Sequence, residues 1–170
     1  MKGHVLLSHG MESGPQANKV SALAAVAGAR GWRSTRPDFR DLDSTRDVER
    51  LPDRINRLLA HIRPGEPLVL AGSSLGAFCS ALASLRVPCR GVFLVAPPLS
   101  IPGFPQPLDL PDVTAEIVHA WDDELIPAAD VIAFASARRL PLHLVDDTHR
   151  LEGHVQAIAR WFDQFLARCE

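Results

Sequence analysis

Short apolar runs alternate with longer amphipathic segments along the whole chain. Six of the apolar runs are predicted to be β-strands: His4–Ser8, Trp32–Pro37, Leu68–Ala71, Gly91–Val95, Val113–His119 and Leu142–Val145. Between them, apolar residues recur at steps of three and four, the spacing of helices that pack one face against a sheet. This alternation predicts an α/β protein with three layers (α/β/α) around a mostly parallel sheet of about six strands.

Proline and glycine delimit the predicted helices. These helices lie between Pro15 and Gly31, from Val48 to Ile62, over Leu75–Leu85, over Ala128–Ala137, and after the last strand, where Leu151, Val155, Ile158, Phe162 and Phe165 share one face. Residues 97–111 contain too many prolines for a helix or a central strand. No repeat, linker or low-complexity tail interrupts the pattern. Residues 1–170 are therefore expected to form a single domain.

Composition narrows the possible partners. The chain is 46% hydrophobic and 22% charged, with a formal net charge of −2, so nothing in its charge favours nucleic acid as a partner. No apolar run approaches the roughly 18 residues that span a bilayer, and the first apolar stretch is too short for the core of a signal peptide. Three cysteines in unrelated segments do not suggest a disulfide framework. We expect a cytoplasmic protein without membrane contact, and the sequence does not indicate its oligomeric state.

The segment Gly72-Ser73-Ser74-Leu75-Gly76 matches the pattern G-x-S-x-G. It follows a predicted strand directly and opens a predicted helix, the setting in which this pattern presents a nucleophilic serine. The flanking glycines select Ser74 over Ser73. Two alternatives are a purely structural turn and a turn that cradles a phosphate, although no lysine follows as in a P-loop.

A serine nucleophile needs a histidine base, and the histidine needs a carboxylate to fix its tautomer. Where the serine lies on such a turn, the chain order is Ser, Asp, His, each beyond a strand end. Asp122 and Asp123 follow the fifth predicted strand, and His149 follows the sixth. His154 is a competing base, but it is expected to lie inside the last helix.

These motifs resemble the α/β-hydrolase family, in particular its small esterases and dienelactone-hydrolase relatives without a lid. The family pattern H-G-x-x-D-x-x-V-P aligns with residues 119–127, which implies Asp123 as the triad acid and leaves Asp122 as the fallback. Ala120 and Ile126 replace the glycine and valine of that pattern. The resemblance covers nearly the whole chain. It departs in lacking the two strands that precede the first strand in most relatives, and in offering no sequence for a helical lid.

The resemblance also implies an oxyanion hole. His9-Gly10-Met11 is similar to the family's H-G-x motif, which assigns the backbone N–H groups of Met11 and Leu75 as its donors. Taken alone, the same residues favour a tight turn after a strand. Trp121, beside the acid, and Phe104, in the proline-rich stretch, are candidate substrate-binding residues, with simple packing as the alternative. No cofactor is expected, and no spacing resembles a metal site.

The activity implied is that of a serine hydrolase cleaving small carboxylic esters, or thioesters, through a Ser-His-Asp triad and an acyl-enzyme. An acyltransferase with the same triad is one alternative. Others are a non-catalytic protein with the α/β-hydrolase fold and a phosphate-binding protein. The expected partner is a small-molecule ester, whose identity the sequence does not specify.

Overall fold

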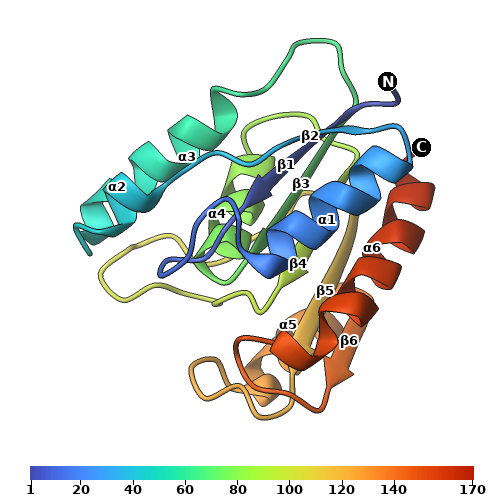
Figure 1. Ribbon diagram of the computed structural model, residues 1–170. Helices are drawn as coiled ribbons and strands as arrows, with labels where there is room; N and C mark the ends of the chain where they lie inside the picture. Colours follow the sequence, from blue (N-terminus) through green and yellow to red (C-terminus); the bar gives the residue numbers. More distant parts are fainter.

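One six-stranded sheet forms the centre of the computed structural model, which describes residues 1–170 (Figure 1). Its strands are β1 (His4–Ser8), β2 (Arg33–Thr35), β3 (Leu68–Ser73), β4 (Gly91–Val95), β5 (Thr114–Ala120) and β6 (Leu142–Val145). Their order across the sheet is β2-β1-β3-β4-β5-β6. Every neighbouring pair is parallel, so the predicted α/β class is confirmed and the sheet is parallel throughout.

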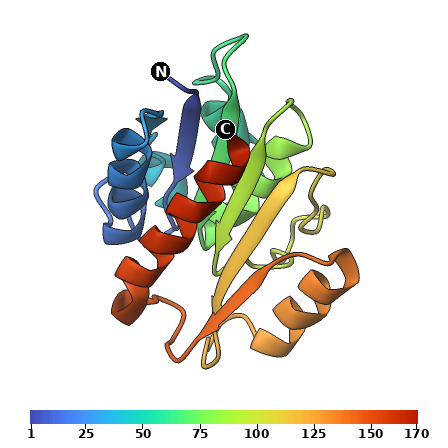
Figure 2. The ribbon, with the colours of Figure 1, turned by 90° about the vertical axis from the view of Figure 1, so that its right-hand side faces the viewer.

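Helices cover both faces of this sheet (Figure 2). They are α1 (Asn18–Ala29), α2 (Arg40–Asp43), α3 (Leu51–Leu59), α4 (Leu75–Ser84), α5 (Ala128–Arg138) and α6 (Val155–Cys169), with 3₁₀ turns η1 (Val48–Arg50) and η2 (Glu152–His154). The apolar residues of α1 and α6 pack on one face, and those of α3, α4 and α5 pack on the other. No helix has both the length and the apolar character needed to cross a membrane.

The strands supply side chains to both layers of the core, because successive residues of a strand point to opposite faces. On β1, Leu6 packs among the residues of α3 and α4, whereas Val5 and Leu7 pack among those of α1 and α6. All three are inaccessible to solvent. Covering on both faces explains why the strands read as continuous apolar runs rather than as alternating ones.

Helix α4 is unusual in being buried along its entire length, all 10 residues of it. It lies against β3 and is covered by α3 on its outer side. Burial raises the pKa of Cys79 on this helix to about 11, so its thiol stays protonated. This agrees with the absence of disulfides, since all three cysteines are free.

Some element boundaries differ from the sequence-based expectations. Pro15 lies before α1 rather than in its first turn, because the Gly14 carbonyl accepts the N–H of Ala17 and closes a separate turn there. The second strand is shorter than predicted, and the short helix α2 was not predicted at all. Pro52 does lie in the first turn of α3, where a missing N–H has no cost.

The strand order creates a possible ligand-binding position at the carboxyl ends of β1 and β3. The chain leaves β1 toward the α1 side and leaves β3 toward the α4 side, so the two following connections diverge. In open parallel sheets, ligands bind at the carboxyl ends of the strands where connections diverge in this way. The ends of these strands meet at Ser8 and Gly72, which are register partners. The predicted Ser74 turn comes directly after this point.

Candidate active site

Ser74 occupies a strained turn between β3 and α4. Its backbone has φ 54° and ψ −122°, a region that residues with a side chain rarely adopt. The two glycines of the motif are needed for close packing. A Cβ on Gly72 would lie 2.4 Å from the carbonyl carbon of Gly76, and one on Gly76 would lie 2.0 Å from the Ser8 carbonyl oxygen. The strand-to-helix turn therefore requires small residues on both sides of the serine.

The structure brings Ser74, His149 and Asp123 into one chain of hydrogen bonds. Ser74 Oγ lies 2.8 Å from His149 Nε2, and His149 Nδ1 lies 2.7 Å from Asp123 Oδ2. An ionised carboxylate only accepts hydrogen bonds, so the Nδ1–H donates to it and leaves Nε2 free to accept the serine proton. This tautomer is the one that a general base requires.

Asp123 is held in place by its own loop. Its side chain is inaccessible to solvent, and its Oδ1 accepts the backbone N–H groups of Leu125 at 2.9 Å and Ile126 at 2.8 Å. Buried His119 lies 3.4 Å from Oδ2 and bonds the Ile126 carbonyl at 3.0 Å, which closes the turn after β5. Both carboxylate oxygens therefore have partners, and the two bonds to Oδ1 hold the carboxylate so that Oδ2 faces His149.

The fallback residues lie elsewhere. Asp122 is exposed, and only its backbone N–H is engaged, by the Asp147 carbonyl at 3.2 Å. His154 pairs with Asp147 instead of Ser74, with Nδ1 2.8 Å from Oδ2. The sequence predicted that His154 lies inside the last helix. In the structure it is the last residue before α6.

Three neighbours hold the loop that carries His149. Asp147 accepts the backbone N–H groups of Thr148 and Gly153. Burial alone would raise the pKa of Asp147, but these bonds and the contact with His154 outweigh it and lower that pKa. Glu124 accepts the backbone N–H of His149 at 3.1 Å. Backbone N–H groups of Glu124 itself and of His149 lower the pKa of the Glu124 carboxyl.

The third support comes from α1. Lys19 Nζ donates to the carbonyl oxygen of Arg150, directly after the base. Partial burial lowers the pKa of Lys19. Together with Asp147 and Glu124, this contact ties both ends of the loop to the surrounding structure. His149 thus lies on a loop that is supported by one of its own side chains and by side chains from two other segments.

The predicted oxyanion loop lies beside Ser74. A Cβ on Gly10 would come within 3.6 Å of Ser74 Cβ. The buried His9 ring bonds the Gly10 carbonyl through Nδ1 at 2.7 Å and accepts the backbone N–H of Phe39 on Nε2 at 3.0 Å. Burial lowers the pKa of His9, which keeps the ring neutral in this arrangement. Met11, the proposed donor residue, follows at the mouth of the site and is 40% exposed.

Leu75 supplies the other predicted donor. It is the first residue of α4, and the first N–H groups of a helix have no partner within the helix. The positive end of the helix dipole also points toward this position. Both predicted donor residues line the cavity that contains Ser74.

Two cavities meet at Ser74 and His149. The larger has a volume of about 820 Å³ and extends from the oxyanion loop between α1, α2 and α3. The smaller has a volume of about 330 Å³ and reaches toward the start of α5. Its walls are mostly apolar and include Leu99, Ile126 and Pro127. A substrate bound at the serine can therefore place one group on each side of it.

The two predicted substrate-binding residues do not line either of these cavities. Trp121 is 55% exposed and is absent from both linings, and Phe104 packs edge-on against Phe78 of α4, with ring centroids 6.0 Å apart. Residues of the same two loops take their place. Those shared by both cavities are Pro98, Ile101, Pro102 and Leu125. For Pro98, Ile101 and Pro102 the sequence signal was the proline-rich stretch itself, which cannot form a helix and so lies as an irregular wall. No group of three or more His, Cys, Asp or Glu side chains is arranged to hold a metal ion.

Comparison with known proteins identifies the family. A proposed hydrolase of the alpha/beta superfamily from Xanthomonas campestris pv. campestris is 53% identical, with a TM-score of 0.91, and the match covers 97% of this chain and 98% of that one. The chain belongs to the α/β-hydrolase superfamily, and this membership supports a hydrolase-type function.

More distant structures share the fold. Est1E from Butyrivibrio proteoclasticus is 17% identical with a TM-score of 0.75, over 98% of this chain and 88% of that one. Alpha/beta hydrolase domain-containing protein 10 from mouse is 16% identical with a TM-score of 0.77, over 100% and 93% of the two chains. No protein-family model and no curated protein matches the sequence.

Proposed function

We propose that this protein is a serine hydrolase that cleaves small carboxylic esters through an acyl-enzyme. The observation that supports the proposal is the continuous chain from Ser74 Oγ to His149 (2.8 Å) and from His149 to buried Asp123 (2.7 Å). Neither distance alone distinguishes a catalytic histidine from a structural one. A neutral imidazole with a hydroxyl on one nitrogen and a buried carboxylate on the other can activate that hydroxyl.

In the first half of the reaction, Ser74 Oγ attacks the carbonyl carbon of the ester while His149 Nε2 takes the hydroxyl proton. The carbonyl oxygen becomes an oxyanion, which the N–H groups of Met11 and Leu75 bind, and Asp123 stabilises the imidazolium. When the tetrahedral intermediate collapses, the bond to the alcohol oxygen breaks and His149 returns the proton to that oxygen. The alcohol leaves, and the acyl group remains on Ser74.

In the second half, His149 removes a proton from water as the water attacks the acyl carbon. A second oxyanion forms in the same place. Its collapse breaks the bond to Ser74 Oγ, and His149 gives the proton to that oxygen. The net change is ester plus water to acid plus alcohol, and the enzyme is regenerated.

The shape of the site favours short, accessible esters. No helix lies between β4 and β5, so residues 96–113 form an irregular wall rather than a helical lid. The smaller cavity, at about 330 Å³, is at the low end of the size of ligand pockets in proteins. Short acyl or alkyl groups fit there, while the larger cavity leaves room for a bulkier group on the other side.

Active-site labelling tests the proposal most directly. A fluorophosphonate should modify Ser74 alone, because only a hydroxyl paired with a base is sufficiently nucleophilic at neutral pH. Peptide mapping locates the label, and a series of p-nitrophenyl esters of increasing acyl length measures turnover. Ser73→Ala is the matched control, since Ser73 is the adjacent, buried serine of β3.

The proposal is contradicted if the label falls on Ser73, or if no label forms on a folded protein. Turnover that appears only above the solubility limit of the ester would contradict the inference of an open site, because that behaviour requires a mobile cover. Adding an alcohol as a competing acyl acceptor separates hydrolysis from acyl transfer. A hydrolase should release mainly the free acid.

A further inference from the structure

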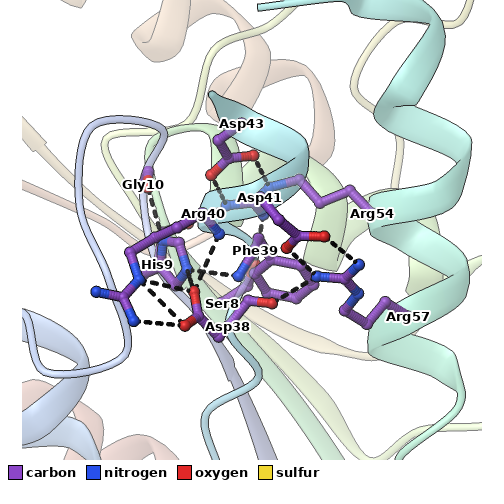
Figure 3. A network of polar contacts seen from close by, with 10 residues as sticks. All are labelled: Ser8, His9, Gly10, Asp38, Phe39, Arg40, Asp41, Asp43, Arg54 and Arg57. Carbon is purple, nitrogen blue, oxygen red and sulfur yellow. Dashed lines mark hydrogen bonds and ion pairs between the residues drawn. The ribbon is translucent and has the colours of Figure 1, made fainter. Parts of the chain in front are cut away.

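A buried ion pair lies behind the oxyanion loop, outside the chain of catalytic side chains (Figure 3). Arg54 of α3 and Asp43 at the end of α2 have side chains that are only 1% and 4% exposed. Arg54 Nε lies 2.8 Å from Asp43 Oδ1, and Nη2 lies 3.2 Å from Oδ2. Desolvating such a pair is expensive, and a pair of apolar residues is often as stable or more stable in its place. Stability alone therefore does not explain this pair.

The guanidinium of Arg54 also reaches the end of β1. Nη1 donates to Ser8 Oγ at 2.8 Å, and Nη2 donates to the His9 carbonyl oxygen at 2.6 Å. The guanidinium carbon sits 4.2 Å from the centre of the Phe39 ring. Phe39 is the residue whose N–H holds the His9 imidazole. Arg54 thus contacts the oxyanion loop directly, and it also packs on Phe39, whose backbone N–H binds the His9 imidazole.

These contacts fix two consecutive peptide groups. The His9 carbonyl is held by Arg54, and the Gly10 carbonyl is held by the His9 ring at 2.7 Å. The chain has no cis peptide bonds, so in each peptide the N–H points opposite to the carbonyl. Turning the Gly10 carbonyl toward His9 therefore turns the Met11 N–H to the other side of the loop. The direction of the Met11 N–H therefore follows from the Gly10 carbonyl, and Arg54 acts one peptide earlier, by holding the carbonyl of the residue whose ring binds Gly10.

We propose that the Arg54–Asp43 pair is a positioning element for the oxyanion hole, acting through Ser8, His9 and Phe39. The inference rests on the proposed function, since it assigns a role to the same Met11 N–H. Asp43 holds the guanidinium plane, and the guanidinium holds the loop. Both residues border the larger cavity, but neither side chain bonds Ser74, His149 or Asp123, so we treat both as positioning residues.

A neighbouring pair offers a matched control. Arg57 lies one helical turn after Arg54 on α3 and pairs with Asp41 of α2 through two contacts of 2.6 and 2.9 Å. It joins the same two helices and also donates to the Asp38 carbonyl at 2.7 Å, but its side chain is one-third exposed and makes no hydrogen bond to the oxyanion loop. If the buried pair served only to join α2 to α3, removing either pair should affect activity in the same way.

The experiment compares two double variants, Arg54→Met with Asp43→Leu and Arg57→Met with Asp41→Leu. Both charges are removed together, because a single change would leave one buried charge unpaired and destabilise the fold. A short p-nitrophenyl ester gives kcat and KM, and a trifluoromethyl ketone, which forms an oxyanion on the serine, gives an inhibition constant. Circular dichroism checks that each variant is folded.

The proposal predicts that the Arg54/Asp43 variant loses about 10²-fold in kcat with KM unchanged, since a donor displaced by about 1 Å stabilises only the transition state less well. Binding of the trifluoromethyl ketone should weaken by the same factor as kcat/KM falls. The Arg57/Asp41 variant should match the wild type in kcat, in KM and in the inhibition constant of the trifluoromethyl ketone. A folded Arg54/Asp43 variant with wild-type kcat, or one with raised KM and unchanged kcat, would overturn the proposal.

A milder variant decides the question if the double variant does not fold. Ser8→Ala removes one acceptor from Arg54 without leaving an unpaired charge, and a several-fold loss in kcat at unchanged KM is expected. An unchanged kcat there would also overturn the proposal. Failure of the proposed function would look different, because the wild type itself would then show no Ser74-dependent turnover.

Discussion

Two histidine–aspartate pairs lie on the same side of the molecule and differ in what the second ring nitrogen meets. In the first, His149 Nδ1 lies 2.7 Å from Asp123, and in the second, His154 Nδ1 lies 2.8 Å from Asp147. Asp123 is completely buried, whereas the Asp147 side chain is 15% exposed. The Nε2 of His149 meets the Ser74 hydroxyl, and that of His154 bonds no side chain or carbonyl.

The difference shows that a histidine–carboxylate contact is not by itself a sign of catalysis. In the second pair, the carboxylate also accepts two backbone N–H groups and closes the loop between β6 and α6. Asp147 therefore stabilises the conformation of the loop that carries His149. In the first pair, the carboxylate is buried and bonded by its own loop, and it orients the imidazole so that Nε2 faces the Ser74 hydroxyl, as the proposed function requires. What distinguishes the two histidines is the Ser74 hydroxyl, which is within hydrogen-bond distance of His149 and not of His154.

Replacing each histidine by alanine should give the largest difference in kcat between the two pairs. His149→Ala, like Ser74→Ala, should lower kcat by about 10⁶-fold, the scale seen when a serine hydrolase loses its nucleophile or base. His154→Ala should stay near the wild-type rate. Initial rates with a short ester measure both. An inactive His154→Ala protein with intact circular dichroism would reverse the assignment of the base.

Replacing the acids should give the next largest difference. Asp123→Asn should lower kcat by about 10⁴-fold, because an amide no longer selects the tautomer that leaves Nε2 free. Asp147→Asn should change kcat no more than several-fold. Asp122→Asn is the control for the neighbouring exposed carboxylate. The acid would have to be reassigned if Asp122→Asn were crippled and Asp123→Asn nearly normal.

The pH dependence of activity should follow the first pair alone. His149 must be neutral to accept the serine proton, so kcat/KM should rise with pH, about tenfold per unit on its acid side. His154→Ala should leave this profile unchanged, whereas His149→Ala should flatten it. Measurements of kcat/KM from pH 5 to 9 check both. A profile that flattens only in His154→Ala would point to the second pair as the titrating group.

The smallest effect should be on stability. Asp147 has a pKa lowered by its hydrogen bonds in the folded state, so its ionised form stabilises the fold above its unfolded pKa. That contribution is lost as pH falls through the lower, folded value. Asp147→Ala should therefore destabilise the protein by about 1–2 kcal/mol at pH 7. Urea unfolding checks this, and the difference from wild type should shrink at pH 3.

The structure brings together the three side chains that the sequence proposed as a triad, whereas the residues around them differ from those expected. Ser74 and His149 could be placed because each follows a strand whose apolar pattern is plain, and strand ends of a parallel sheet converge on one edge. Asp123 depended on the resemblance of residues 119–127 to a family pattern. Whether Trp121 or Leu125 faced the cavity could not be decided, since a loop has no period that sets the direction of a side chain. The structure places Leu125 at the cavity and Trp121 in solvent.

The buried pair behind the oxyanion loop left a signal that was not used. Leu51, Ile55 and Leu58 form the apolar stripe of α3, and Arg54 falls on the same side of that helix. A charged residue on a buried stripe requires a partner, but nothing in the order of residues says which one. Asp43 lies in the short helix α2, which is too short for a periodic pattern. Long-range pairing of this kind is settled only by the packing of the fold.

The complete burial of α4 has a consequence for how the site fluctuates. Segments without solvent-exposed surface exchange their amide hydrogens only when the whole domain unfolds, whereas exposed loops open locally at much lower free energy. The amides that follow Ser74 along α4 should therefore exchange slowly, with global unfolding. Those of the exposed loop around His149 and Arg150 should exchange faster, through local opening. Ser74, the proposed nucleophile, thus adjoins a segment that should persist as long as the fold itself, whereas the loop of His149, the proposed base, is expected to open more often. Loss of alignment on warming should therefore begin at the histidine.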